Sequence, residues 1–170
     1  TIVLIDLSGR KDNVVTTQTQ IIKLQRSNFI QQLLAGITGG VVGGIFFGFL
    51  MWIQGMLPLV AQLVGSDSLL VGGIIHMSIS ILFGALFGLV VERWQTGLLQ
   101  PASLGLLYGI FWWVFGASII MPILLGSTPQ LSSAFSTPSL WSLVGHLFFG
   151  LFTGLVVAFM TLSKNLEFWS

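Results

Sequence analysis

Cysteine is missing from this chain of 170 residues, and charge is scarce, since only 6% of the residues are Asp, Glu, Lys or Arg. The missing thiols exclude a disulfide framework, thiol catalysis and cysteine-ligated metals. A soluble domain carries about 25% charged residues, so these few charges cannot cover a soluble surface. A net charge of +1 without a basic patch excludes nucleic-acid binding. Together with a mean hydropathy of +0.97, this composition predicts that lipid surrounds most of the chain.

Three long stretches lack charged residues altogether: 27–66, 68–91 and 94–163. A helix needs about 20 apolar residues to cross the hydrocarbon core, so the first two stretches supply one span each and the third supplies two. A cluster rich in Ser, Thr and Pro at 127–139 separates those two. We expect helices near 29–55, 69–91, 103–125 and 140–163, in one domain over 28–165. An N-terminal segment, 1–27, precedes this domain, and a tail, 166–170, follows it.

The positive charges predict the orientation of these helices. With four crossings, all of them fall on one side of the membrane, in the two terminal segments and in the loop between the second and third helices. Lys and Arg concentrate on the cytoplasmic side of membrane proteins. We therefore predict an all-α integral membrane four-helix bundle with cytoplasmic N- and C-termini, in a bacterial inner membrane or, alternatively, a thylakoid-type membrane. The positive residues are Arg10, Lys11, Lys23, Arg26, Arg93 and Lys164.

The N-terminal segment contains two short runs of β-branched and aliphatic residues, 2–5 and 14–17, separated by polar residues. This pattern predicts a β-hairpin that serves as a docking strand for a partner. The alternative is a frayed terminus. In residues 18–27, Ile21, Ile22 and Leu24 stand among polar side chains, a pattern that predicts a helix leading into the membrane.

Segment 83–91 of the second helix resembles segment 149–157 of the fourth, at an offset of 66 residues. At nearly the same offset, Gly44-Ile45-Phe46 in the first helix matches Gly109-Ile110-Phe111 in the third. These matches predict two tandem helical hairpins of the same topology.

Each predicted helix carries glycines four residues apart. Residues at i and i+4 share a helix face, so each pair of glycines forms a groove without side chains. Because lipid offers no hydrophobic drive for association, helices in membranes depend on such close approach of their backbones. We expect these glycines to pack helices within the bundle or within an oligomer: Gly36, Gly40, Gly44, Gly48, Gly84, Gly88, Gly105, Gly109, Gly150 and Gly154.

Three residues within the spans have chemistry beyond packing: His76, Tyr108 and His146. The simplest interpretation is that each histidine hydrogen-bonds a serine or a carbonyl across the bundle. Alternatively, the imidazoles ligate haem or chlorophyll, with nearby glycines leaving room for a macrocycle. A third alternative is that they line a path for protons or a small solute. Two histidines do not complete a zinc site, and we expect no metal centre and no enzyme activity.

Residues 76–146 resemble the YagU-like family of small polytopic inner-membrane proteins. The resemblance lies in His76-x-Ser78, in the stretch Pro122-Ile123-Leu124-Leu125-Gly126-Ser127-Thr128-Pro129, and in Gly145-His146 at the start of the last helix. The N-terminal segment has no counterpart in that family. The resemblance implies a non-enzymatic membrane protein and assigns no role to either histidine.

Three functions follow as expectations. The leading one is a non-catalytic accessory or assembly subunit that packs through its glycine-rich faces, as a homo-oligomer or within a larger membrane complex. The second is a homo-oligomeric channel or permease with the histidines in its path. The third is a pigment- or haem-binding subunit of a photosynthetic or respiratory complex.

Overall fold

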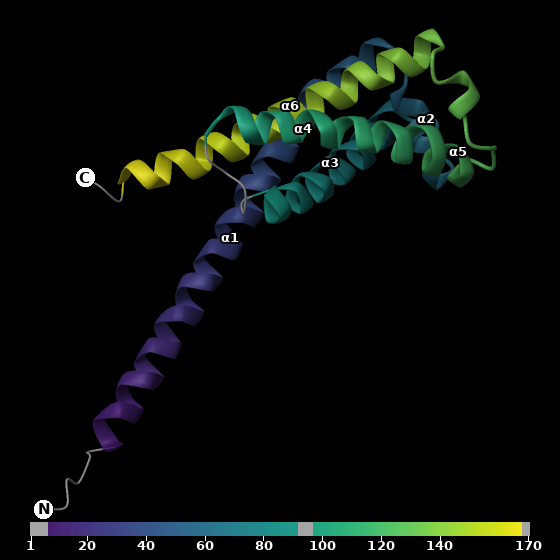
Figure 1. The fold of residues 1–170 in the computed structure, drawn as a ribbon. Coiled ribbons are helices and arrows are strands. Elements are labelled where there is room, and N and C mark those ends of the chain that lie inside the picture. Colours follow the sequence, from purple (N-terminus) through teal and green to yellow (C-terminus); the bar gives the residue numbers. More distant parts are fainter. Residues whose placement is uncertain (1–6, 92–96, 168–170) are drawn as a thin grey trace, which may run out of the picture. The chain divides into compact units, whose positions relative to one another are not determined.

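The computed structural model describes residues 7–91 and 97–167, with side chains for 29–91 and 97–162. The chain forms two compact units, Thr1–Gln31 and Gln32–Ser170. The first contains the beginning of helix α1 (Leu7–Ile53), and the second contains the rest of α1 and all later elements. In the described part of the chain every regular element is a helix (Figure 1), which confirms the all-α prediction.

Four helical segments are long and apolar enough to cross a membrane: Phe29–Ile53, Leu69–Val91, Leu99–Leu124 and Thr137–Leu162. The first lies in α1, the second is α3 (Leu69–Val91), and the fourth lies in α6 (Thr137–Glu167). The third joins α4 (Leu99–Trp112), a π-helix η3 (Trp113–Ile120) and α5 (Met121–Leu124). These spans are consistent with an integral membrane protein.

The third and fourth spans begin at Leu99 and Thr137, three or four residues before the predicted starts at 103 and 140. The reason is the position of two prolines. Pro101 and Pro138 lie in the first turns of α4 and α6, where proline loses no intrahelical hydrogen bond because the first N–H groups have no partner. We predicted a loop that ends at residue 139, but Pro138 already belongs to the helix.

The predicted N-terminal β-hairpin is wrong, because its second strand, 14–17, and its turn lie within α1. The first strand, 2–5, lies outside the described residues. β-branched residues lower helix propensity only slightly. Extending a helix that already exists avoids the cost of nucleation, so α1 continues through this segment and through the predicted lead-in helix, 18–27.

The π-helix η3 ends next to Pro122, which has no N–H to donate to the carbonyl four residues earlier, that of Ser118. The backbone N–H of Gln130, in the loop after α5, donates to that carbonyl instead, at 2.8 Å. The Ser118 hydroxyl donates to the carbonyl of Trp113, five residues before it, at 3.0 Å. Wide turns of this type are frequent at functional sites. Here they accompany a proline and the two hydrogen bonds of Ser118.

Short elements connect the spans. Helix α2 (Leu57–Ala61) and the 3₁₀-helix η1 (Gln62–Val64) follow α1, and the 3₁₀-helix η4 (Leu131–Ser133) precedes α6. Helix α2 packs on α3, since a Cβ added to Gly72 would meet the carbonyl oxygen of Leu57. Gly65 ends η1 with φ of 72°, a left-handed conformation that favours glycine.

The buried apolar residues form two clusters along the bundle. The first centres on Phe47 and Met51 of α1, with α2 and Phe149 of α6 around them. The second joins Phe87 of α3 to Val157 of α6 and to the glycine-rich part of α1. Most other large apolar side chains of the spans are exposed, as expected for helices that face lipid tails.

Candidate functional site

Helices α1 and α3 touch through their backbones at the predicted glycines. A Cβ added to Gly36 would lie 3.0 Å from the Cα of Gly88, and a Cβ added to Gly40 would lie 3.0 Å from the Cα of Gly84. Both distances are shorter than ordinary van der Waals contact, so any side chain here would force the helices apart. Dispersion contacts between backbones, which depend on this approach, can supply the attraction that lipid does not.

Helices α4 and α6 run side by side in Figure 1 and approach each other in the same way. A Cβ added to Gly105 would lie 2.8 Å from the carbonyl carbon of Gly150, and one added to Gly109 would lie 2.9 Å from that of His146. A Cβ on Gly154 would lie 2.8 Å from the carbonyl carbon of Pro101.

The remaining two predicted glycines, Gly44 and Gly48, face side chains of α3. A Cβ added to Gly44 would lie 2.6 Å from the Cβ of Ser80, and one added to Gly48 would lie 3.1 Å from Cδ2 of His76. All ten predicted glycines therefore lie at contacts between helices of one chain.

A second glycine row on α1 was missed by the sequence reasoning. A Cβ added to Gly39 would lie 2.8 Å from the carbonyl oxygen of Thr153, and one added to Gly43 would lie 2.5 Å from that of Phe149. The hydroxyl of Thr153, which is fully buried, donates to the carbonyl of Gly39 at 3.2 Å. The paired glycines at 39–40 and 43–44 were the available signal, because each pair places glycines on two adjacent faces. Helix α1 thus packs on α3 with one row and on α6 with the other.

His76 of α3 is buried and makes the hydrogen bond across the bundle that the simplest interpretation predicts. Its Nε2 lies 2.9 Å from the carbonyl oxygen of Gly44 in α1. A carbonyl can only accept, so Nε2 carries the proton. The hydroxyl of Ser80, one turn along α3, lies 3.5 Å from the same nitrogen. This hydrogen bond ties the imidazole to the backbone of the neighbouring helix.

His146 of α6 is held within its own helix rather than across the bundle. Its Nδ1 donates to the carbonyl of Ser142 at 2.8 Å, and the Ser142 hydroxyl lies 3.5 Å from that nitrogen. With the proton on Nδ1, the Nε2 of His146 is an acceptor. Within the described residues no hydrogen bond to this Nε2 is found.

The ring of Phe47 lies between the two histidines. Its centroid is 5.2 Å from that of His76, in an edge-to-face arrangement, and 4.6 Å from that of His146. The same ring occupies the space beside Gly145, where an added Cβ would collide with it. Of the three glycines beside which we expect room for a macrocycle, Gly72 meets the α2 backbone and Gly145 meets Phe47, whereas a Cβ added to Gly73 would have no atom within 4 Å. Between the two histidines, Phe47 leaves no room for haem or chlorophyll.

Tyr108 of α4 belongs to an aromatic contact with α3. Its hydroxyl donates to the carbonyl of Phe83 at 2.9 Å, and its ring lies 5.1 Å from that of Phe87. One turn further along α4, the ring of Trp112 lies against Phe83, with centroids 3.8 Å apart and the ring planes tilted by 32°. The sequence reasoning did not identify Trp112.

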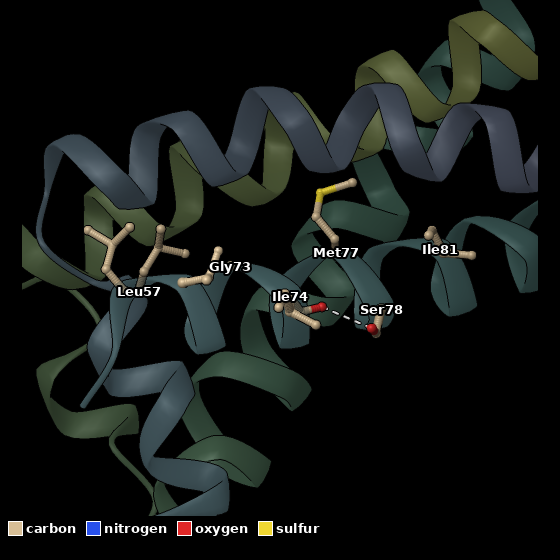
Figure 2. Close-up of a pocket in the computed structure, with 8 residues that line it drawn as sticks. Leu57, Gly73, Ile74, Met77, Ser78 and Ile81 are labelled. Atoms are coloured by element: carbon tan, nitrogen blue, oxygen red, sulfur yellow. Dashed lines mark hydrogen bonds between the residues drawn. The ribbon is translucent and has the colours of Figure 1, made fainter. Parts of the chain in front are cut away.

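An open groove of about 440 Å³ runs along α3 beside the start of α2 (Figure 2). Its one polar side chain is Ser78, whose hydroxyl donates to the carbonyl of Ile74 in its own helix at 2.9 Å. The groove offers dispersion contacts only, which suits an apolar chain. Its lining residues are Leu57, Leu69, Leu70, Gly73, Ile74, Met77, Ser78 and Ile81.

Comparison of the chain with protein-family models, with curated proteins and with solved structures gives no match. The resemblance to the YagU-like family stays a prediction.

Proposed function

We propose that this chain is a non-catalytic accessory or assembly subunit of a membrane complex. The observation that carries the proposal is the way its interior is filled. Backbones touch at the glycines between α1 and α3 and between α4 and α6, and Phe47 fills the space between the histidines. Residues that bring helices together occupy the places where a transport path or a cofactor would need room.

In this proposal the partner protein contacts the third span. In its most apolar window 17% of the residues are buried, against 33–39% in the other three spans. Phe111 and Phe115, whose rings lie 4.6 Å apart, face outward from this span with exposed fractions of 45% and 47%. Aromatic side chains bury large areas when they pack, and they are enriched in the cores of interfaces.

Native mass spectrometry after purification in a gentle detergent tests this function. We expect an oligomer or a complex with another membrane protein, and the Phe111→Ala, Phe115→Ala double variant should lose it. Phe159→Ala in α6 is the matched control, because this side chain is also exposed, at 69%, on another helix. A monomeric wild-type protein that carries only lipid would contradict the proposal.

A second candidate function is a path for protons or a small solute, and the histidines favour it. His76 and His146 come from different helices and contact the same ring, and in the part of the chain that the structure describes each has one hydrogen bond shorter than 3 Å. Histidine is a side chain that relays protons in membrane proteins. Flux into liposomes that falls with His76→Ala would support this function, and flux equal to that of empty liposomes would exclude it.

We also propose that both termini face the cytoplasm, as the distribution of Lys and Arg predicts. A reporter that is active only outside the cytoplasm, fused after Ser170, should stay inactive. The same reporter inserted in the loop that holds Asp67 should be active. Activity after Ser170 would overturn this orientation.

A further inference from the structure

The two pairs of packed helices, α1 with α3 and α4 with α6, make equivalent backbone contacts. A Cβ added to Gly84 of α3 would lie 2.5 Å from the carbonyl oxygen of Gly36 in α1. A Cβ added to Gly150 of α6, 66 residues later, would meet the carbonyl oxygen of Gly105 in α4. The contacts thus match when α3 is compared with α6 at an offset of 66 and α1 with α4 at an offset of 69, from Gly36 to Gly105.

A second set of contacts agrees with the same offsets. A Cβ added to Gly40 would meet the carbonyl oxygen of Ser80, and a Cβ added to Gly109 would meet that of His146. The sequence match of Gly44 with Gly109 gives an offset of 65 instead. The two alignments of α1 with α4 differ by four residues, about one helical turn. Both therefore match the same face of each helix, but they are shifted along the helix axis by about one turn.

At these offsets the contacts between the two helix pairs also correspond in position, but the side chains that make them differ in size. Where α1 meets α6, Gly39 and Gly43 lie against Thr153 and Phe149. We call this contact the α1/α6 seam. It brings the backbones together, because two of its four residues have no side chain.

The corresponding contact joins α4 to α3, and we call it the α3/α4 seam. Tyr108 takes the place of Gly39 and Trp112 takes the place of Gly43, and they lie against Phe87 and Phe83. Here the helices meet through four aromatic rings and one hydrogen bond, from the Tyr108 hydroxyl to the Phe83 carbonyl. One turn further along, the side-chain sizes are reversed: α1 carries Phe47, and the corresponding residue of the third span is Gly116.

We infer that the two helix pairs move as rigid units, and that the bundle opens at the α3/α4 seam while the α1/α6 seam stays closed. Backbone contact within each pair and at the α1/α6 seam leaves no space into which a helix could shift, because close-packed interiors transmit displacement. Aromatic pairs adopt both offset-stacked and edge-to-face arrangements, so the tilted rings of the α3/α4 seam can change their arrangement and stay in contact. The π-helix η3 begins directly after Trp112, and wide helical turns of this type are frequent at functional sites.

Pairs of spin labels test this inference, and the chain suits them because it has no cysteine of its own. Leu86→Cys with Leu107→Cys places labels on α3 and α4, at side chains that are 43% and 62% exposed. The control pair, Ile45→Cys with Phe148→Cys, labels α1 and α6 at side chains that are 58% and 40% exposed. Distances are measured by pulsed electron paramagnetic resonance in nanodiscs of phosphatidylethanolamine and phosphatidylglycerol.

We expect the α3/α4 pair to show a second, longer distance and the α1/α6 pair to show a single narrow one. Tyr108→Phe removes the hydrogen bond of the α3/α4 seam and should raise the ratio of longer to shorter distances about fivefold. Thr153→Val is the matched control, since it removes the hydrogen bond of the α1/α6 seam but leaves the glycine contacts. It should leave the α1/α6 distance narrow.

Two results would overturn the inference. One is a single α3/α4 distance, as narrow as that of the control pair, both in the wild type and in Tyr108→Phe. The other is an α1/α6 distribution as broad as that of the α3/α4 pair, which would mean that the glycine seam moves too. In either case the difference in side-chain size between the seams would have no effect on motion.

Discussion

Helix α3 offers a direct test of the glycine packing, because it contains glycines against a neighbouring backbone, such as Gly84, and one in open space, Gly73. A Cβ added to Gly84 would lie 2.5 Å from the carbonyl oxygen of Gly36, whereas a Cβ added to Gly73 would have no atom within 4 Å. The substitutions Gly84→Ala and Gly73→Ala make the same chemical change in the same helix. We expect Gly84→Ala to destabilise the protein and Gly73→Ala to have little effect or to stabilise it.

The size of the difference follows from the geometry. Ordinary van der Waals contact begins at 3.4 Å, so α1 and α3 must separate by about 1 Å to accept the methyl group of Gly84→Ala. Overpacking of this kind costs about 1 to 3 kcal/mol. Replacing glycine by alanine also changes helix propensity, by about 1 kcal/mol, but this contribution is the same in both variants. The difference in the free energy of unfolding between them is therefore the overpacking cost alone.

Thermal unfolding of the two variants in the same detergent, followed by circular dichroism, measures this difference. We expect a lower melting temperature for Gly84→Ala than for Gly73→Ala. Equal melting temperatures would refute the reasoning, because they would show that α3 does not contact α1 at Gly84. A variant that fails to accumulate in the membrane, when Gly73→Ala accumulates normally, would agree with it.

Three further predictions use the same unfolding assay. Gly150→Ala should cost about 1 to 3 kcal/mol, as Gly84→Ala does, because its methyl group would meet the backbone of α4; no loss of stability would contradict equivalent packing in the two helix pairs. His76→Leu should cost about 1 kcal/mol, because it removes the buried hydrogen bond that Nε2 donates to the Gly44 carbonyl of α1; an unchanged melting temperature would show that this hydrogen bond contributes nothing. Ser118→Ala should cost about 1 kcal/mol and speed hydrogen exchange in the π-helix, whereas Ser103→Ala, which removes an exposed hydroxyl bonded within its own helix, should change neither.

The four membrane-spanning helices could be predicted from the sequence because lipid imposes a simple constraint. About 20 residues without charge are needed for each crossing, and Arg26, Asp67, Arg93 and Lys164 separate stretches of that length. The ends of the helices were harder to predict. Proline breaks a helix in its interior but not in its first turn, and the sequence alone did not show that Pro138 stands in a first turn.

The N-terminal segment shows the limit of local propensity. Residues 14–17 favour a strand by side-chain type, and they lie in α1. The preference of β-branched residues is worth only tenths of a kcal/mol per residue, less than the cost of interrupting a helix and starting a hairpin that has no sheet to join.

The glycines of α1 show what periodicity can predict and what it cannot. Spacing at i+4 identified Gly36 and Gly40 as residues of one face, and the structure places α3 against that face. It could not identify which helix covers which face, so the role of Gly39 and Gly43 against α6 was missed. The position of Phe47 between the histidines was missed for the same reason, because it depends on contacts among three helices.

The offset of 66 residues between α3 and α6 explains why the two histidines behave differently. At this offset His76 corresponds to Ser142, and Ser80 corresponds to His146, so each helix carries one histidine and one serine a turn apart, in opposite order. The histidines are therefore not at corresponding positions but lie one turn apart along equivalent helices. His76 reaches the carbonyl of Gly44 because α1 has no side chain there. In α6 the position of His76 is held by Ser142, whose carbonyl accepts the hydrogen bond from Nδ1 of His146.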